Sequence, residues 1–452
     1  MEFKNLTPFD GLAFSSYDTQ DRPYHVVAMK AGYQLVHVEG TRWAAQLMES
    51  APLSLCLADE HWGDPVASSL REESDLAPYK PRCDVLVRGH AHAPGDQPAR
   101  DWTVHLRLLQ TRHEEVPEPA PPIPLNPVIG LTPTQLAQWE SDKRSFQHLV
   151  RIAKARPPRT VIDKQLRVMG PSHFVRTPVV GWSRTASEAA DKVALRWEHS
   201  FGGSCYVADG ESGTPLLNEV CFSNPLGKGW LEARWEQALQ KAKQPLPKEL
   251  PAPQIVGQNG SDLQAPVFEQ HPEGEQDARQ MRAIATRYRA HPVGLASLGR
   301  SWAPRLSLAG TYDDNWLKER HPYLPKDFDF AYYNCAPADQ QIPFPDLTEG
   351  YELQTLGLTP GGGAMRVLLP PHRALVLADL GGARLPLPMQ VDTITLDTDA
   401  MQISIVWRTA CLKSMEPESL ELRFKPDPNA PWVSYSPIDE TEQSDPVAGA
   451  ST

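Results

Sequence analysis

Proline is the residue type that most limits how this chain can fold, because 45 of its 452 residues are prolines. That share is about twice the usual one. Proline fixes φ, lacks an amide donor, and interrupts both helices and central strands. The sequence therefore predicts a loop-rich, mainly β protein with short strands. Its 40% hydrophobic content and 12 tryptophans exclude a chain that is disordered throughout.

Length and charge limit the function classes. A chain of this length corresponds to roughly three domains, or two large ones. Its 44 Lys and Arg against 56 Asp and Glu give a net charge of −12, whereas a protein that mainly binds the nucleic-acid backbone is usually basic. We find no apolar run near the roughly 18 residues of a membrane span and no signal-peptide pattern. We therefore expect a cytoplasmic protein that binds neither nucleic acid nor membranes.

Short apolar or alternating runs, bounded by Pro, Gly or Asp, predict the strands. Ala31 and Gly32 are expected to form a hairpin turn between the first two. The fold class we expect is mainly β with a helical minority, built as short-stranded antiparallel sandwich or open-barrel-like sheets. The predicted strands are 24–30, 33–38, 53–57, 84–88, 102–109, 165–169, 193–199, 364–369, 373–380, 390–396, 401–408 and 420–424.

Three helices are predicted. The longest covers 132–156, where Thr132 is the N-cap, Pro133 opens the first turn, and apolar residues recur on one face. We expect that face to dock on the body of the protein; the alternative is that it contacts a partner. The other two helices are expected at 229–244 and 311–322.

Proline-rich stretches and composition also predict the domain organisation. The expected parts are an N-terminal β-rich domain at 1–115, a Pro-rich linker with an inserted helix at 116–160, a mixed region at 161–345 with a helical insertion at 229–266, a C-terminal β-rich region at 346–430, and a disordered tail at 431–452.

The chemical motifs are weak. His90 and His92 share one face of an extended segment, but no further metal ligand follows at a useful spacing. Gly361 to Gly363 lack the Lys-Ser/Thr of a phosphate-binding loop, and a hairpin loop is expected there instead. Cys83 lies between Arg82 and Asp84 without a catalytic signature. We therefore expect no catalytic residue, no metal and no cofactor.

All six cysteines are expected to be free thiols, because their spacing forms no framework. They are Cys56, Cys83, Cys205, Cys221, Cys335 and Cys411.

Several segments resemble the DUF2169 family, whose members accompany type VI secretion effectors as adaptors. The longest is SLREESDLAPYKPRCDVLVRGHAHAP at 69–94, and the resemblance extends from residue 1 to about 425. The stretches 131–158 and 231–266 look like additions to the family pattern. The other resembling segments are 1–9, 58–64, 196–203 (RWEHSFGG), 224–230 (NPLGKGW), 301–313, 316–317, 324–329 and 333–341.

Two groups within these segments are candidate structural or recognition residues. In the first, mixed charges lie close together; we expect an ion network that orients a loop, and a polar recognition surface is the alternative. In the second, aromatic residues accompany an arginine; a core position is the default, and an exposed cluster would be a binding hot spot. The candidates are Glu72, Asp75, Tyr79, Lys80, Arg82, Asp84, Trp302, Arg305, Tyr312 and Trp316.

The resemblance implies a non-enzymatic adaptor or chaperone. Its expected partner is a type VI effector or the PAAR-type domain of one, which it would help to load onto the valine-glycine-repeat (VgrG-type) spike. The acidic charge of the chain would keep such an adaptor soluble. The alternative is a carbohydrate-directed β-sandwich enzyme or binding module, with which the tryptophans and scattered carboxylates are also compatible. A carboxylate pair about 5–10 Å apart in a cleft with exposed Trp would favour that alternative.

Overall fold

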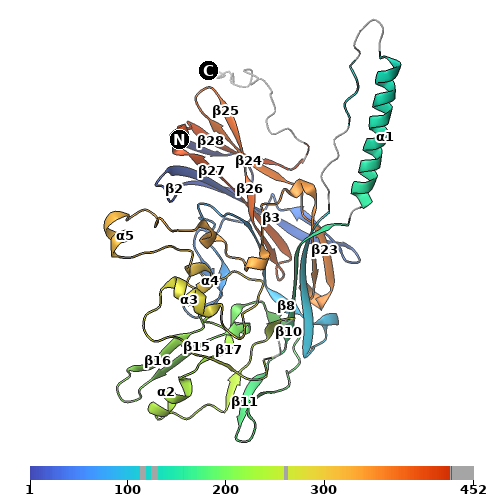
Figure 1. Ribbon diagram of the computed structural model, residues 1–452. Coiled ribbons are helices and arrows are strands. Elements are labelled where there is room, and N and C mark those ends of the chain that lie inside the picture. Colours follow the sequence, from blue (N-terminus) through green and yellow to red (C-terminus); the bar gives the residue numbers. More distant parts are fainter. Residues whose placement is uncertain (112–118, 124–130, 156, 259–262, 428, 430–452) are drawn as a thin grey trace, which may run out of the picture.

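The computed structural model describes residues 1–111, 119–123, 131–155, 157–258, 263–427 and 429. The predicted tail at 431–452 and most of the predicted linker before the long helix lie outside these residues. The protein is mainly β, which confirms the predicted class. Its largest sheet curls into an open half-barrel (Figure 1). The strands follow the order β19 (Ile255–Gly257), β10 (Arg159–Met169), β9 (Asp101–Gln110), β22 (Tyr351–Leu356), β23 (Ala364–Leu368), β4 (Arg42–Leu47), β3 (Pro23–Glu39), β27 (Gln402–Leu412), β26 (Gln390–Asp397), β7 (Cys83–Arg88) and β21 (Gln341–Ile342), while β2 (Asp10–Tyr17) also pairs with β3.

The central strand of the half-barrel corrects the predicted turn at Ala31 and Gly32. β3 runs without interruption for 17 residues, because β27 pairs with it across Ala31 and Gly32. Gly32 serves packing instead of a turn: a Cβ there would lie 2.6 Å from Cγ of Leu53. β3 is therefore longer than the short strands that we expected.

A second sheet packs against the half-barrel and shares its core. Val27 and Leu106 of the half-barrel belong to the same buried cluster as Val376 and Leu420 of the second sheet. The first and last strands of the described chain pair in parallel. This sheet has the order β1 (Glu2–Asn5), β28 (Ser419–Lys425), β24 (Arg373–Asp379) and β25 (Arg384–Pro388).

Small sheets and short helices form the lower part of Figure 1, around a second core that contains Trp230, Trp235 and Tyr288. The short strands are β5 (Glu60–His61), β6 (Leu70–Glu72), β8 (His90–His92), β11 (His173–Thr177), β12 (Gly181–Arg184), β13 (Lys192–Ala194), β14 (Phe201–Gly202), β15 (Ser204–Ala208), β16 (Pro215–Val220), β17 (Lys228–Glu232), β18 (Glu249–Pro251) and β20 (Val267–Glu269). The described helices are α1 (Pro133–Ala155), α2 (Trp235–Lys241), α3 (Ala278–Ala285), α4 (Ala303–Leu306) and α5 (Asp314–Glu319).

Three further predictions of local structure need correction. The segment 53–57 is not a strand, because amides of Leu55 and Cys56 bond to carboxylates of Asp10 and Asp75. The predicted strand at 193–199 covers only the end of β13 before a 3-10 turn. The predicted helix at 229–244 begins as strand β17, paired on both sides, and is helical only in α2.

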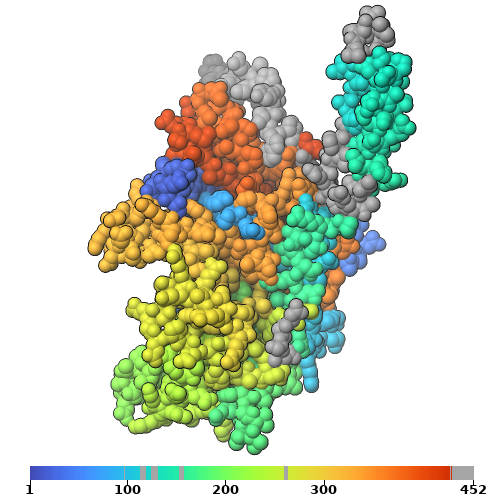
Figure 2. Space-filling view, in the orientation of Figure 1, coloured from blue at the N-terminus to red at the C-terminus, as the bar shows by residue number. Residues whose placement is uncertain are grey.

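Helix α1 has nearly its predicted bounds but not its expected docking. It extends away from the body of the molecule (Figures 1 and 2). None of its described side chains is buried, and Leu136 and Leu149 are 43% and 50% exposed. The apolar positions therefore do not join the main core. Across the residues that the structure describes, no helix has the length and apolar character to cross a membrane.

Candidate functional site

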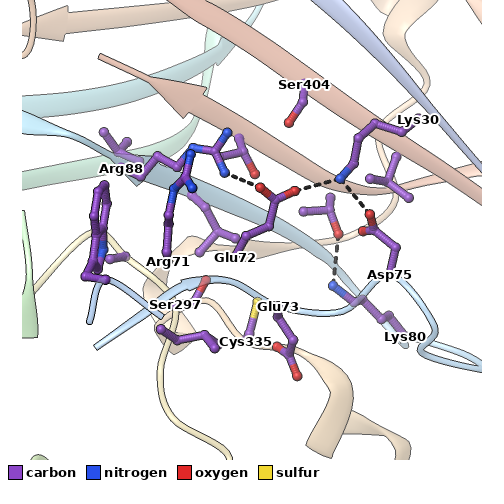
Figure 3. Close-up of a pocket in the computed structure, with 18 residues that line it drawn as sticks. Lys30, Arg71, Glu72, Glu73, Asp75, Lys80, Arg88, Ser297, Cys335 and Ser404 are labelled. Carbon is purple, nitrogen blue, oxygen red and sulfur yellow. Dashed lines mark hydrogen bonds and ion pairs between the residues drawn. The ribbon is translucent and has the colours of Figure 1, made fainter. Parts of the chain in front are cut away.

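Glu72, the last residue of β6, lies between the two cations Lys30 and Arg88 (Figure 3). Its carboxylate is 2.6 Å from Nζ of Lys30 and also binds Nη1 of Arg88. Arg88 in turn donates from Nε to Asp397 at 2.7 Å. Burial favours the neutral form of Glu72, but Lys30 and Arg88 outweigh it and hold the pKa of Glu72 below its ordinary value.

Asp75 completes the environment of Lys30. Its carboxylate lies 2.6 Å from Nζ of Lys30 and accepts the amide of Cys56 at 2.8 Å. Burial alone would lower the pKa of Lys30; the charges of Asp75 and Glu72 outweigh burial and raise it. Arg408, paired with Asp392, donates to the backbone carbonyl of Asp75 at 2.8 Å. Strands β3, β26 and β27 thus fix the loop through charge-assisted bonds.

Glu73 binds a different pair of cations. Its Oε1 lies 2.7 Å from Nη2 of Arg305 and 2.6 Å from Nε of Arg300. Burial opposes ionisation, but Arg305 outweighs it and keeps the pKa of Glu73 below its ordinary value. Arg305 is 2% exposed and also donates to the carbonyls of Leu298 and Tyr332, each at 2.7 Å. This arginine ties the loop to helix α4.

Asp84 and Lys80 form a further buried pair, 3.0 Å apart, and Lys80 also donates to Thr393 at 2.9 Å. The Asp84 carboxylate is completely buried and accepts the amides of Cys335 and Ala336 at 3.0 and 3.2 Å. Burial would lower the pKa of Lys80, but Asp84, together with Asp392 and Glu73, raises it. Buried charges persist when they are paired and hydrogen-bonded, as these are.

The cavity enclosed by these residues has a volume of about 30 Å³. Its lining includes Lys30, Glu72, Glu73 and Arg88. That volume holds one or two water molecules, which is far less than a small-molecule site of about 300 Å³ or more. The ion-paired centre is therefore a compact scaffold that positions the loop between β6 and β7.

The other candidate residues of the charged loop lie at the surface. Tyr79 is 43% exposed and meets Phe330 edge to face. Arg82 is exposed, and its Nη1 donates to the carbonyl of Gln341 at 3.3 Å. The structure thus separates Tyr79 and Arg82 from the buried group of Glu72, Asp75, Lys80 and Asp84.

The aromatic candidates also separate into two groups. Trp302 is buried edge to face against Trp197, with ring centroids 5.7 Å apart. Tyr312 and Trp316 pair at 4.6 Å on the protruding α5 arm (Figure 1), where Tyr312 is 52% exposed. The indole of Trp316 donates to the carbonyl of Tyr323 at 2.9 Å. Asp313 caps α5 through its side chain.

Two sequence segments of the resemblance meet at Asn224. Its side-chain amide donates to the carbonyls of Trp197 and Phe201, both at 2.9 Å. Glycine at 202 is needed here, since a Cβ would lie 2.2 Å from the carbonyl oxygen of Asn224. The backbone amide of Trp197 bonds to Oγ of Ser69 at 3.1 Å, which links both segments to the charged loop. The segments 69–94, 196–203 and 224–230 therefore contact one another through these hydrogen bonds.

The weak motifs have structural explanations. His90 binds Asp399 at 2.8 Å, and no group of three or more metal-ligating side chains occurs among the described residues. Gly361 to Gly363 lie in the hairpin between β22 and β23, as predicted.

All six cysteines are buried, free thiols. Burial raises the pKa of the Cys83 thiol well above its ordinary value, which disfavours the nucleophilic thiolate.

Sequence reasoning did not identify the partners of the charged loop. Lys30, Arg300 and Arg408 lie far from the loop in sequence and bind it only through the fold. Lys30 had a usable signal, because it interrupts the apolar run from Val26 to Ala31. A lysine in such a run requires a buried carboxylate.

Two open grooves are also features that the sequence did not reveal. One has a volume of about 600 Å³ and follows β10 and β19. The other has a volume of about 520 Å³ and lies along β14 and β17, with Phe174 and Leu250 in its lining. Both fall within the size range of ligand sites, and their partly apolar linings suit a peptide or side chains of a partner.

Comparison with known protein families identifies the family of this mainly β protein. The sequence model of an uncharacterized protein conserved in bacteria (DUF2169) matches residues 20–115 and 135–408. The chain therefore belongs to the DUF2169 family. The match includes most of α1 and all of 231–266, the two segments that the sequence suggested as additions. Searches of curated proteins and of solved structures gave no match.

Proposed function

We propose that this protein is a non-enzymatic adaptor or chaperone of type VI secretion. It binds an effector, or the PAAR-type domain of one, and promotes its loading onto the VgrG-type spike. The resemblance described above supplies the biological role. The observation that carries a binding function is the combination of a rigid, ion-paired body with two open grooves and the projecting helix α1.

The use of the buried charges supports this proposal. The carboxylates of Glu72, Glu73 and Asp75 each bind lysine or arginine at close range. A general acid or base needs access to a substrate, whereas these groups surround a cavity of water size. Their arrangement suits a scaffold that holds surfaces in place for a protein partner.

Among the described residues, we find no observation that supports the carbohydrate alternative as the grooves and ion pairs support the adaptor. Carbohydrate enzymes commonly pair a carboxylate cleft with accessible aromatic rings. Trp62 lies beneath Arg71 and Arg196, and Trp197 and Trp302 are buried together. The adaptor proposal therefore remains the better supported of the two.

The test is co-expression of the tagged protein with the effector, PAAR-type and spike proteins encoded by flanking genes. We expect one effector or PAAR-type protein to co-purify in a defined stoichiometry and to reach the spike only when this protein is present. An unrelated effector is the specificity control. Equal loading with and without this protein, or no complex with any of these proteins, contradicts the proposal.

A further inference from the structure

Among the described residues, strand β10 is paired along its whole length on one side only. It pairs with β9 from Arg159 to Met169, but with β19 only from Leu166 to Val168. The amide of Met169 donates to Gln254 at 2.8 Å, which shows that odd-numbered residues here direct their backbone groups toward the β19 side. Asp163 and Gln165 therefore direct their amide and carbonyl groups toward the same side, beyond the end of the β19 pairing.

The groove of about 600 Å³ lies beside this edge. Leu166, Ile255 and Val256 supply apolar lining from the two strands, and Val293 adds to it. Lys164 is held at the groove by Asp339 at 2.7 Å and by Gln340 at 2.8 Å. The described part of the groove thus combines free backbone groups with a fixed and partly apolar surface.

Prolines distinguish this edge from another sheet edge of the molecule. The edge strand β25 carries Pro386 and Pro388, which lack amide donors and discourage pairing. Residues 162–165 of β10 contain no proline, although the chain is rich in it. A bulge at Val161 marks the far end of this regular stretch. The four residues 162–165 form an edge that can accept a short added strand.

The groove also offers an unpaired positive charge. Asp163 is engaged by His105 at 2.5 Å and lies 3.6 Å from Arg107. Arg289 lines the groove and is exposed, and its guanidinium has no carboxylate partner among the described residues. An acidic side chain on a partner would complement this arginine.

We propose that an extended segment of a protein partner adds as a strand to β10 at residues 162–165. Its backbone bonds to Asp163 and Gln165, alternate apolar side chains enter the groove, and an acidic residue faces Arg289. This is strand addition, in which main-chain bonds supply affinity and the groove supplies specificity. The inference rests on the proposed function, because it names the surface that receives the cargo.

The probe is a fluorescein-labelled synthetic peptide of about ten residues, long enough to span the edge. It alternates valine with threonine and carries one central aspartate. Its control is the same peptide N-methylated at the central amides, which removes backbone donors and keeps the side chains. Anisotropy titrations with the full chain should show saturable binding of the first peptide only.

Gly257 provides a matched pair of variants. It lines the groove, and a Cβ there would meet only Cγ1 of Val293, at 3.6 Å. Gly257→Ala should keep binding within about twofold, while Gly257→Phe should fill the groove and weaken binding by about tenfold or more. Arg289→Glu should weaken binding of the aspartate peptide and favour the same peptide with lysine. Thermal melts of every variant verify folding.

Each outcome decides the inference. No saturable binding, equal binding of the methylated peptide, or unchanged binding by a folded Gly257→Phe protein overturns it. If wild type and Gly257→Phe both co-purify with the effector, strand addition fails while the proposed function stands. If wild type captures the peptide but no effector or PAAR-type protein, the proposed function fails and the edge remains a peptide-binding site.

Discussion

Lys30 lies within the apolar run of β3, and its side chain is 3% exposed. Its ammonium group holds together two carboxylates, Glu72 and Asp75, that would otherwise repel each other. Removing one member of a buried ionic group leaves the others uncompensated, which is more damaging than losing an exposed pair. The charged loop is therefore expected to be sensitive to the loss of this lysine.

We predict that Lys30→Ala lowers the free energy of unfolding by about 3–5 kcal/mol. Urea titration at neutral pH measures the loss. The matched control is Lys4→Ala, which breaks the exposed pair with Glu2 and should change stability by less than about 1 kcal/mol. Similar effects of the two substitutions would contradict the assigned role of Lys30.

His271 is a second sensitive residue, in the smaller core. Its ring stacks on Phe222 with centroids 4.3 Å apart, and Nε2 lies 2.9 Å from the hydroxyl of Tyr288. Burial lowers the pKa of His271 below its ordinary value of 6.5, although the carboxylate of Glu219 acts in the opposite direction. The unfolded chain therefore takes up this proton first as the pH falls.

That order of protonation predicts the sign of the pH effect. The contribution of neutral His271 to the free energy of unfolding is complete above pH 6.5. It decreases as the pH falls toward the lower pKa of the folded state. His271→Phe removes this contribution, so its unfolding midpoint should depend less on pH between about 7.5 and 5.5 than that of wild type. A steeper dependence in the variant would show that the folded state instead favours protonated His271.

At the scale of elements, local signals predicted α1 well. Thr132 accepts the amide of Gln135 through Oγ1 at 3.3 Å, and the Gln135 side chain accepts the Thr132 amide at 3.1 Å. This reciprocal arrangement is a capping box, which sequence neighbours alone can form. The bounds of α1 therefore agree within one residue with the predicted 132–156.

Elements whose identity depends on distant partners could not be predicted in this way. Gly32 looks like a turn residue, but its position follows from Leu53 packing on β3. Trp230 and Leu231 fit a helical pattern, yet two parallel neighbours make their segment a strand. In the candidate site, the sequence predicts the charged loop from its closely spaced charges. It does not predict the cations that bind this loop, because they come from other strands and helices.

Replacing 131–158 with a short Gly/Ser linker tests the role of α1. Because no described side chain of α1 is buried, we expect the melting temperature to change by less than about 2–4 °C, while effector co-purification falls. The control replaces α2, whose Trp235, Ala238 and Leu239 are buried, and should lower the melting temperature strongly. Aggregation of the α1 variant would instead place this helix in the core.

At the scale of the whole molecule, residues far apart in the chain complete one another's sheets. β1 pairs with β28, and β3 lies between β4 and β27 in the half-barrel. β9, from the predicted N-terminal domain, pairs with β22, from the predicted C-terminal region. The principal core accordingly draws side chains from both of these regions. The early strands therefore need the late ones to cover their edges and apolar faces.

This topology predicts the effect of truncation. A fragment of residues 1–345 lacks β22 to β28, which exposes the edges of β3 and β9 together with the core face of the half-barrel. We expect it to aggregate or to lack a cooperative melt, because exposed apolar edges pair with other chains. A chain ending at 429 keeps every strand that the structure describes and should melt within about 2–4 °C of the full chain. A cooperative transition of 1–345 near the full-length temperature would show instead that the N-terminal regions fold as independent domains.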